Sequence, residues 1–340
     1  MKIDLKGISK EQLEEYIVNM GEKKFRAKQI YDWIYKYAKS IDDIKNISND
    51  LKIKLNENFT FTNLNIKEKL ISKIDGTRKY LFELEDLNVI ESVMMEYKHG
   101  VSVCLSTQVG CKMGCKFCAS GLDGLKRNLK ASEILDQVLK IQEDIGKRVS
   151  NIVLMGTGEP LDNYDEVLKF LKLINDKNGL NIGYRHITLS TCGLVKEINR
   201  LAEERLPINL AISLHSCYDE NRKEIMPIAR KYSIKELIDA CKNYINITNR
   251  RVTFEYALIE NVNDNKEDAL KLAGLLRNML SHVNLIPVNN VDENDYKRPN
   301  KKRIEEFKNI LIDKNIEVTV RREMGKDING ACGQLRRSNS

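Results

Sequence analysis

The chain has 340 residues, enough for one large domain and a smaller one, and 42% of them are hydrophobic, enough for a sizeable core. No run approaches about 18 consecutive apolar residues, and the polar start MKIDLKGISKEQLEE lacks the apolar stretch of a secretory signal. We therefore expect a cytoplasmic protein with no membrane partner, whose eight cysteines stay reduced and serve metal binding or catalysis rather than disulfides. The net charge of +7 permits a nucleic-acid partner without establishing one.

Residues 1–60 are predicted to form a small helical domain. The stretches EQLEEYIVNM and FRAKQIYDWIYKY carry apolar residues at three-to-four spacing, with Gly21 between them. The second stretch mixes basic and aromatic residues, which suits an RNA-contacting helix. It also suits an amphipathic helix whose aromatic residues pack inward, and composition alone slightly favours this second interpretation.

Residues 61–100 are predicted to form a β-rich connector. Two strand-like runs flank Asp75-Gly76, a dipeptide typical of a tight hairpin turn, and the run VIESVMMEYK follows them. The connector would join the helical domain to a main domain that comprises residues 101–340.

From residue 101, short apolar runs alternate with amphipathic helical segments. Strands that are apolar throughout, each followed by a helix, indicate a parallel sheet, and six such units favour a partial (β/α)6 barrel over a closed eight-fold one. The fold class is therefore α/β. The six predicted strands are VSVCLS (101–106), NIVLMG (151–156), HITLST (186–191), INLAISLH (208–215), VTFEYALI (252–259) and HVNLIPV (282–288).

Unusual polar residues follow these strands repeatedly. In parallel βα folds the chemistry gathers at the carboxyl ends of the strands, so these residues should share one rim. In chain order they are the cysteine loop GCKMGCKFCAS, then GTGEP (156–160), Ser190-Thr191, Ser213-Leu214-His215 and Asn289.

The cysteine loop holds Cys111, Cys115 and Cys118 in a C-x3-C-x2-C pattern. Thiolates are soft ligands that suit zinc or an iron–sulfur cluster. A structural zinc ion would need a fourth ligand from a distant residue such as Cys192 or His215. A four-iron cluster held by three cysteines leaves one iron open for a substrate, and we favour this interpretation.

The C-x3-C-x2-C pattern after a first barrel strand resembles the radical S-adenosylmethionine (SAM) superfamily, and GTGEP resembles that superfamily's second motif. With CLSTQVGCKMGCKFCASG, MGTGEPL, LSTCG, SLHS, HVNLIPVN and GACGQL, the chain resembles the RlmN/Cfr family of radical SAM RNA methyltransferases over nearly its whole length. GEPL at 158–161 favours the RlmN branch, which methylates adenine C2, over the Cfr branch, which methylates C8. The implied fold is the partial barrel of the radical SAM type.

The resemblance implies methylation of C2 of adenine 2503 in 23S rRNA, with adenine 37 of tRNAs as a candidate second substrate. The implied cofactors are a [4Fe-4S] cluster on Cys111, Cys115 and Cys118 and two SAM molecules per turnover. An electron donor such as flavodoxin or ferredoxin is a further implied partner. We expect a monomer, because nothing in the sequence requires more.

The resemblance also assigns catalytic roles. Cys332 would carry the methyl group as S-methylcysteine, and Cys104 would release the product by removing the C2 proton and closing a disulfide with Cys332, which requires Cα atoms within about 6 Å at that step. Glu91 matches the family's proton acceptor, although an exposed strand carboxylate explains it equally well. The residues implied to bind SAM are Gly158, Glu159, Ser190, Ser213, Leu214, His215 and Asn289.

Other interpretations remain open at this stage. For His215 taken alone, a buried barrel histidine is the simpler interpretation, and Cys192, Cys217 and Cys241 suit small buried apolar residues. Basic pairs such as Arg321-Arg322 suit a phosphate-binding rim, although charge runs are usually solvated. The alternative functions are a Cfr-type C8 methyltransferase of 23S rRNA, a glycyl-radical activating enzyme that has no use for Cys332, and a zinc-dependent RNA-binding protein.

Overall fold

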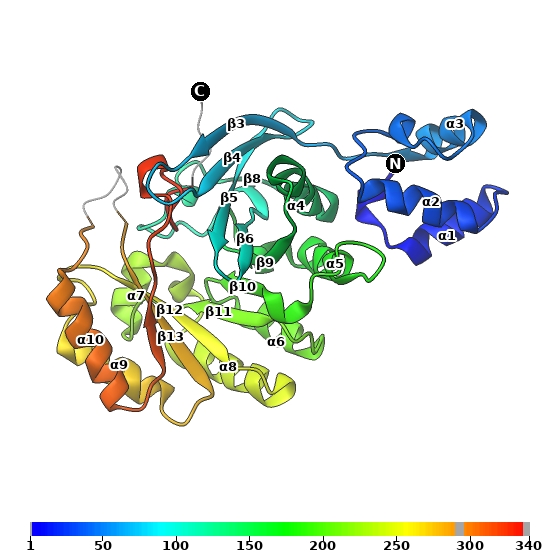
Figure 1. Cartoon of the computed structure of the whole chain (residues 1–340). Helices are drawn as coiled ribbons and strands as arrows, with labels where there is room; N and C mark the ends of the chain where they lie inside the picture. The colour runs from blue at the N-terminus through cyan, green and yellow to red at the C-terminus, as the bar shows by residue number, and fades with distance from the viewer. Residues whose placement is uncertain (1, 290–295, 336–340) are drawn as a thin grey trace.

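The computed structural model describes residues 2–289 and 296–335. A small helical unit at the N-terminus lies beside a large α/β body (Figure 1). None of the described helices is both long and apolar enough to cross a membrane.

The N-terminal unit packs three helices around its own apolar core. A capping box of Ser9 and Gln12 starts its first helix. On the second helix Tyr31 is buried, whereas Phe25 is 52% exposed, so the aromatic residues expected to pack inward do so only in part. The helices are α1 (Lys10–Asn19), α2 (Phe25–Ile34) and α3 (Asn49–Asn58), and the short strands β1 (Ile3–Asp4) and β2 (Phe59–Thr60) pair beside them.

A single sheet dominates the rest of the described chain. Its ten strands run in the order β14-β13-β12-β11-β10-β9-β6-β5-β4-β3, and it stays open because β14 and β3 are its edges. The six predicted strands all form and pair in parallel, which confirms the α/β partial barrel, and β14 adds one more parallel strand. These parallel strands are β6 (Gly100–Cys104), β9 (Val149–Leu154), β10 (Ile187–Thr191), β11 (Asn209–Ser213), β12 (Val252–Leu258), β13 (Ser281–Pro287) and β14 (Val318–Val320).

Helices follow the parallel strands and cover one side of the sheet (Figure 1). Their apolar faces pack on strand side chains that alternate toward the same core, as parallel βα units require. Ser233 and Glu236 form the expected capping box at the start of α8. The helices are α4 (Ala131–Ile145), α5 (Tyr164–Asn175), α6 (Val195–Glu203), α7 (Asp219–Ile225), α8 (Ile234–Thr248), α9 (Lys266–Leu276) and α10 (Lys301–Asp313).

The predicted connector is part of the main sheet rather than a separate piece. Strands β3 (Asn65–Ile71), β4 (Arg78–Glu83) and β5 (Val89–Tyr97) pair antiparallel, with the expected hairpin turn at Asp75-Gly76. Because β5 also pairs with β6, the ladder continues without a break into the parallel strands. Sequence periodicity identified these strands but not this pairing.

A buried ion pair attaches the N-terminal unit to the α/β body. The Lys6 ammonium lies 2.5 Å from the Asp136 carboxylate on α4, and both side chains are almost fully buried. The other Asp136 oxygen accepts a hydrogen bond of 2.7 Å from the Leu64 backbone N–H. One carboxylate therefore holds both the start of the chain and the segment that leads into β3.

We expect Asp136→Ala to destabilise this attachment by about 3–5 kcal/mol, because it leaves the buried Lys6 charge without its partner. Urea denaturation and limited proteolysis of the segment 61–64 should both report the loss. The matched control is Asp32→Ala, which removes the exposed Lys28–Asp32 pair and should cost less than about 1 kcal/mol. Equal costs for the two variants would contradict the proposed attachment.

Candidate active site

A cavity opens where the carboxyl ends of the parallel strands meet. Its empty volume is about 1020 Å³, counting the open mouth. Most of the residues predicted from sequence line it together: Cys111, Cys115, Cys118, Gly158, Glu159, Ser190, Ser213, His215, Asn289 and Cys332. The structure thus brings together residues from positions 111 to 332 in one place, which we call the main cavity.

The three-cysteine loop is closed at its base by a hairpin that the sequence did not predict. Strand β7 (Gln108–Gly110) pairs antiparallel with β8 (Leu125–Asn128), and the Cys111 N–H donates to the Gly124 carbonyl at 3.0 Å. Gly110 has φ 78°, and an added Cβ would lie 1.9 Å from that same carbonyl oxygen. A glycine is therefore required at this position for the loop to close.

The chemistry of this loop fits a thiolate-bound metal cluster. Burial raises the pKa of Cys111 to about 12 and raises the pKa values of Cys115 and Cys118 above their usual value. Metal ligation requires thiolates, so a bound metal centre would displace these protons and offset the cost of burying the negative charges. Among residues 2–289 and 296–335, no three His, Cys, Asp or Glu side chains converge on a point where one metal ion could sit. The fit to a cluster therefore rests on the soft donor set and on the cavity beside it.

Glu159 places a buried carboxylate in the main cavity. Its oxygens accept hydrogen bonds from the backbone N–H groups of Leu161 at 3.0 Å and Cys192 at 2.7 Å. Burial raises its pKa, although these bonds favour the charged form. A cation entering the cavity would favour the carboxylate further.

The glycines of GTGEP make room for the protein's own backbone. An added Cβ at Gly156 would lie 2.6 Å from the Leu105 carbonyl oxygen, and one at Gly158 would lie 2.6 Å from the Gln108 Cβ. Gly158 also has φ 109°, a conformation that other residues rarely adopt. These glycines therefore let β9 end against the segment after β6, with Gly158 still exposed to the cavity.

The Ser213-Leu214-His215 run presents two of its three side chains to the main cavity. Ser213 and His215 line it, whereas Leu214 does not, because its side chain is buried in the core. The His215 Nδ1 accepts a hydrogen bond of 2.9 Å from the Ala257 N–H. Its ring packs edge-to-face with the Phe117 ring, with the two ring centroids 4.7 Å apart. Burial lowers the pKa of His215 to about 3, so the ring is neutral with its Nε2 protonated at neutral pH.

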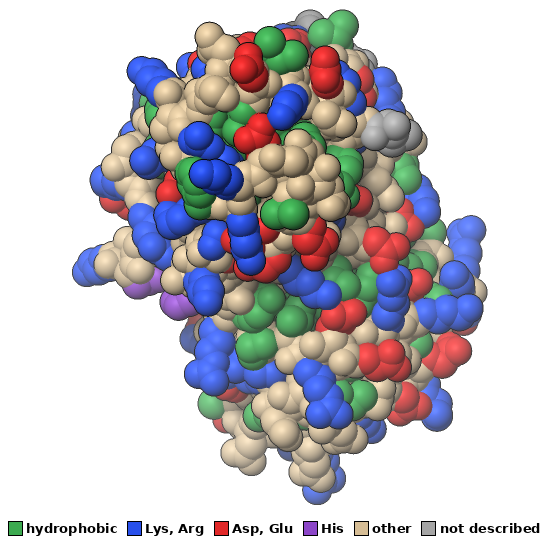
Figure 2. Space-filling model, turned by 90° about the vertical axis from the view of Figure 1, so that its right-hand side faces the viewer, with side chains coloured by type: hydrophobic (Ala, Val, Ile, Leu, Met, Phe, Trp, Pro, Cys, Tyr) green, Lys and Arg blue, Asp and Glu red, His purple; other side chains and the backbone are tan. Residues whose placement is uncertain are grey.

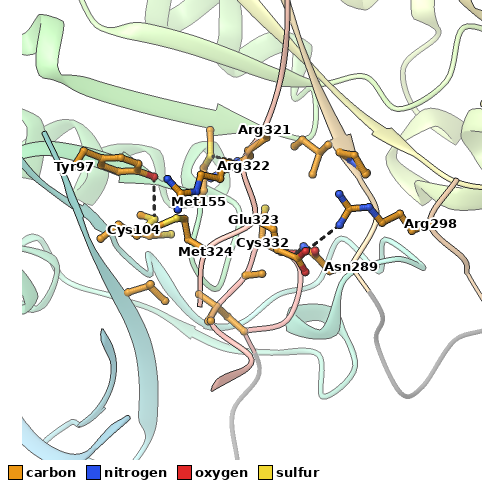
Figure 3. A pocket seen from close by; sticks show the side chains of 17 residues that line it. Tyr97, Cys104, Met155, Asn289, Arg298, Arg321, Arg322, Glu323, Met324 and Cys332 are labelled. Atoms are coloured by element: carbon orange, nitrogen blue, oxygen red, sulfur yellow. Dashed lines mark hydrogen bonds and ion pairs between the residues drawn. The ribbon is translucent and has the colours of Figure 1, made fainter. Parts of the chain in front are cut away.

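Cys332 lies between the main cavity and a second, smaller one. The second cavity has an empty volume of about 630 Å³ and is lined by Cys104 and Cys332 together (Figure 3). Cys104 comes from β6, whereas Cys332 is exposed on the C-terminal loop, where its carbonyl accepts a 3.0 Å hydrogen bond from Asn289. All eight cysteines lie within the described residues and are free thiols, so the structure contains no Cys104–Cys332 disulfide.

Glu91 is not the exposed strand carboxylate that the sequence left as an alternative. Its side chain is 1% exposed and lies 2.7 Å from the Lys79 ammonium. Val93 and Met95, two and four positions further along β5, line the second cavity. Every second side chain of a strand points to the same face, so Glu91 faces this side of the sheet. The sequence indicates a carboxylate at this position, but Glu91 is buried because β5 pairs with β4 and β6 on its two sides.

Arg321 and Arg222 are two charged residues that sequence reasoning missed as site residues. Arg321 was expected on a phosphate-binding rim, yet it lines both cavities. Burial lowers its pKa, but Cys332, Glu255 and Cys104 outweigh burial and raise it overall, so it stays charged. No motif distinguished Arg321 from other basic pairs.

Arg222 is fully buried beneath the main cavity. Its guanidinium donates to the carbonyls of Leu214 at 3.0 Å and Cys192 at 2.8 Å, at the ends of β11 and β10. Its Nη1 has no hydrogen-bond partner among the described residues. Cys115 is among its electrostatic neighbours, so negative charge on the cysteine loop would be favoured.

Comparisons with known proteins agree with this geometry. Residues 105–273 match the family model of the radical SAM superfamily, and residues 3–61 match that of the ribosomal RNA large subunit methyltransferase N-terminal domain. A probable dual-specificity RNA methyltransferase RlmN from Alkaliphilus oremlandii is 61% identical over 336 residues, which cover 99% of this chain and 98% of the relative. A protein of the same description from Clostridioides difficile is 58% identical over 336 residues, with the same coverage of 99% and 98%.

A solved structure supports the same relationship. The crystal structure of a radical SAM methyltransferase from Sphaerobacter thermophilus has a TM-score of 0.94 and 42% sequence identity, covering 99% of this chain and 100% of that one. The similarity therefore includes the N-terminal unit as well as the barrel.

We expect His215 to make the protein less stable as pH falls below about 6.5. The unfolded histidine binds a proton near pH 6.5, whereas the folded one does so only near pH 3, so the unfolded state binds more protons between these values. The free energy of unfolding of wild type, relative to His215→Gln, should therefore drop by about 1.4 kcal/mol per pH unit between pH 6 and pH 4. Urea denaturation at several pH values measures this. The exposed His186, replaced by Gln, is the control, and identical pH slopes for wild type and His215→Gln would contradict the assignment.

Proposed function

The chain belongs to the RlmN family of radical SAM RNA methyltransferases, and on that premise we propose that it methylates C2 of adenine through an S-methyl group on Cys332. The proposed targets are adenine 2503 of 23S rRNA and, as a second substrate, adenine 37 of tRNAs. The observation that carries the proposal is that Cys332 lines both the main cavity, with its three-cysteine loop, and the second cavity, with Cys104. A thiol between the two cavities can receive a methyl group from one and deliver it in the other.

Radical SAM enzymes use a [4Fe-4S] cluster and SAM, and these cofactors, when bound, supply a 5′-deoxyadenosyl radical. We assign the cluster to Cys111, Cys115 and Cys118. Glu159 is placed to receive the SAM ammonium group, because it is a buried carboxylate whose pKa a neighbouring cation would lower. Gly158, Ser190, Ser213, His215 and Asn289 line the remainder of the proposed SAM site, and Leu214 would contribute only its backbone.

A thiol carrier is needed because adenine C2 is a poor nucleophile. This carbon lies between two electron-withdrawing ring nitrogens, so it does not attack a sulfonium methyl as an amine would. A thiolate does so readily, and Cys332 is the exposed cysteine of the described chain. In the proposal Cys332 takes the methyl group of a first SAM molecule, loses one hydrogen atom from that methyl in the radical step that consumes a second, and adds the resulting carbon to C2.

Cys104 is the proposed partner for product release. Burial, followed by the nearby Cys332, raises the pKa of Cys104 to about 12, so it is a neutral thiol at neutral pH. The Arg321 charge favours the thiolate, which is the form that can remove the C2 proton. A disulfide with Cys332 would then close as the bond between the Cys332 sulfur and the transferred carbon breaks. The Cys104 proton would move to that carbon, and the one electron left over would pass to the redox partner. Glu91 stays a candidate proton acceptor, supported by its burial on the face of β5 that borders the second cavity.

An RNA substrate must reach these cavities by presenting an unstacked base. The net charge of +7 favours the phosphate backbone. On the side of the molecule that carries the N-terminal helices, Lys and Arg side chains gather over the left part of the view (Figure 2). An electron donor of the flavodoxin or ferredoxin kind completes the proposal, and a monomer suffices because one chain supplies all the residues named.

The alternative functions proposed from sequence agree to different degrees with the relatives. A zinc-dependent RNA-binding protein and a glycyl-radical activating enzyme do not agree with relatives described as RNA methyltransferases over 99% of the chain. A Cfr-type C8 methyltransferase shares the cysteines and the cavities, so only the identity of the product separates it from the C2 enzyme.

We expect Cys332→Ala to reduce methyl transfer to RNA by roughly a hundredfold or more, because the mutant has no thiol to carry the methyl group. The measurement is anaerobic turnover of the cluster-loaded enzyme on unmodified rRNA with methyl-labelled SAM. Cys241→Ala is the matched control, because Cys241 lies buried on α8 and lines neither cavity. Labelled RNA from the Cys332→Ala enzyme at the control rate would rule out the carrier thiol.

We expect the methylated adenosine to be 2-methyladenosine. GEPL at 158–161 is the feature that favours C2, and mass spectrometry of digested product RNA against 2-methyl and 8-methyl standards measures the outcome. Unmodified RNA without enzyme is the blank. An 8-methyl product would move the chain to the Cfr-type activity.

A further inference from the structure

The loop that carries Cys332 meets the turn of the β3–β4 hairpin. In Figure 1 the red C-terminal segment, with its short 3-10 helix η7 (Lys326–Ile328), lies against the end of that blue hairpin. Ser72 and Asp327, which touch here, are 255 residues apart in sequence. The contact is therefore purely tertiary, and neither segment's local pattern indicates it.

The two segments exchange carboxylate hydrogen bonds. The Gly325 N–H donates to the Asp75 carboxylate at 2.9 Å, from the C-terminal loop to the hairpin turn. In the opposite direction, the Ser72 hydroxyl and the Lys73 N–H donate to the two oxygens of Asp327 at 2.6 and 2.9 Å. We call Ser72, Asp75 and Asp327 the latch. Because each segment both donates and accepts, the latch sets one register between them.

The latch is partly shielded from water: Ser72 is buried, Asp75 is half-buried and Asp327 is exposed. Most of β3 is exposed, yet Ser72 is 4% exposed and Thr77 is fully buried. Gly325 has φ 65°, and an added Cβ would lie 2.9 Å from the Thr77 methyl carbon. Such close packing at a hairpin turn, where side chains are normally solvated, indicates a specific docking site for the loop.

The same hairpin is tied to Cys104 through the sheet. Cys104 lies opposite Val93, and Val93 lies opposite Lys79, so these residues form one row across β6, β5 and β4. Two strand spacings separate Cys104 from Lys79, about 10 Å. The Lys79 ammonium donates to the Asn329 carbonyl at 3.4 Å, which is on the loop just before Cys332.

The other end of the loop is held separately. The Ala119 N–H, next to the last cluster cysteine, donates to the Gly333 carbonyl at 2.8 Å, and Asn289 donates to the Cys332 carbonyl at 3.0 Å. Cys332 therefore lies between two sets of contacts. Upstream, the loop is held by the β3–β4 hairpin, and at Cys332 and Gly333 it is held by Asn289 and Ala119 beside the main cavity. Loss of the upstream anchor would leave the cluster loop intact but free the thiol from its position relative to Cys104.

We propose that the latch of Ser72, Asp75 and Asp327 positions Cys332 between the two cavities, which makes these three positioning residues for the methyl-carrying thiol. The inference rests on the proposed role of Cys332 and adds a part of the chain to which no chemistry was assigned. Its physical basis is that a reacting group displaced by about 1 Å can lose two orders of magnitude in rate. The latch holds the loop with hydrogen bonds on both sides, so breaking it should affect the chemical step more than binding.

The test compares wild type with Asp327→Ala in the cluster-loaded enzyme. Hydrogen exchange followed by mass spectrometry should show amides of residues 325–335 exchanging about tenfold faster, and kcat for RNA methylation should fall about tenfold with KM values for SAM and RNA unchanged. Asp327→Asn keeps the shape of the side chain and part of its hydrogen bonding, so it should give intermediate values. Ser72→Ala combined with Asp327→Ala should change exchange in residues 325–335 little beyond Asp327→Ala alone. The other hydrogen bonds of the Ser72 hydroxyl, from the Ile74 and Asp75 N–H groups, lie within the hairpin turn.

The matched control is Asp86→Ala. Asp86 lies in the turn between β4 and β5, away from the C-terminal loop, and pairs with Arg127 on β8. It should leave exchange in 325–335 unchanged. Unchanged exchange in Asp327→Ala, or faster exchange with kcat at the wild-type value, would overturn the latch. A wild-type enzyme that fails to methylate adenine C2 would overturn the proposed function instead, and the exchange comparison would still decide whether the latch holds the loop.

Discussion

Strand β6 is the element on which both cavities depend, because it takes part in two kinds of ladder at once. Cys104 pairs with Val93 in the antiparallel ladder and with Val153 in the parallel one. The first ladder joins it to β5 and, through β5, to the β3–β4 hairpin that docks the C-terminal loop. The second joins it to β9, which ends at Leu154, shortly before Glu159. After β6 the chain continues through β7 into the three-cysteine loop. A shift of β6 by one residue would turn Cys104 to the other face and separate all of these groups.

Several buried ionisable groups line the main cavity. Burial raises the pKa values of the three loop cysteines and of Glu159, and lowers that of His215, so it disfavours the charged forms of these groups. Arg321, which also lines the cavity, stays charged. Arg222 adds one fixed positive charge from below. Cluster binding requires thiolates and would release protons from these thiols, and the ammonium group of SAM would favour the Glu159 carboxylate.

Close backbone packing explains several motif residues better than direct ligand contact does. Gly110 allows the cysteine loop to close on Gly124, and Gly156 and Gly158 allow β9 to end against Leu105 and Gln108. These glycines place the cysteine loop and Glu159 side by side. A motif can therefore mark a binding site although part of it contacts only protein.

The sequence by itself determined the local elements and the chemistry of the rim. Apolar runs with amphipathic segments after them predicted the parallel strands and helices, because period and length are local properties. Cysteine spacing indicated a candidate metal-binding loop, because one short loop contains all three proposed ligands. Only the tertiary structure decided which distant segments meet. It joined the expected connector to the main sheet, buried Glu91 against Lys79, turned Arg321 inward and docked the Cys332 loop on Asp75. These outcomes depend on strand pairing and burial between residues up to 255 positions apart, and no local pattern encodes a partner so far along the chain.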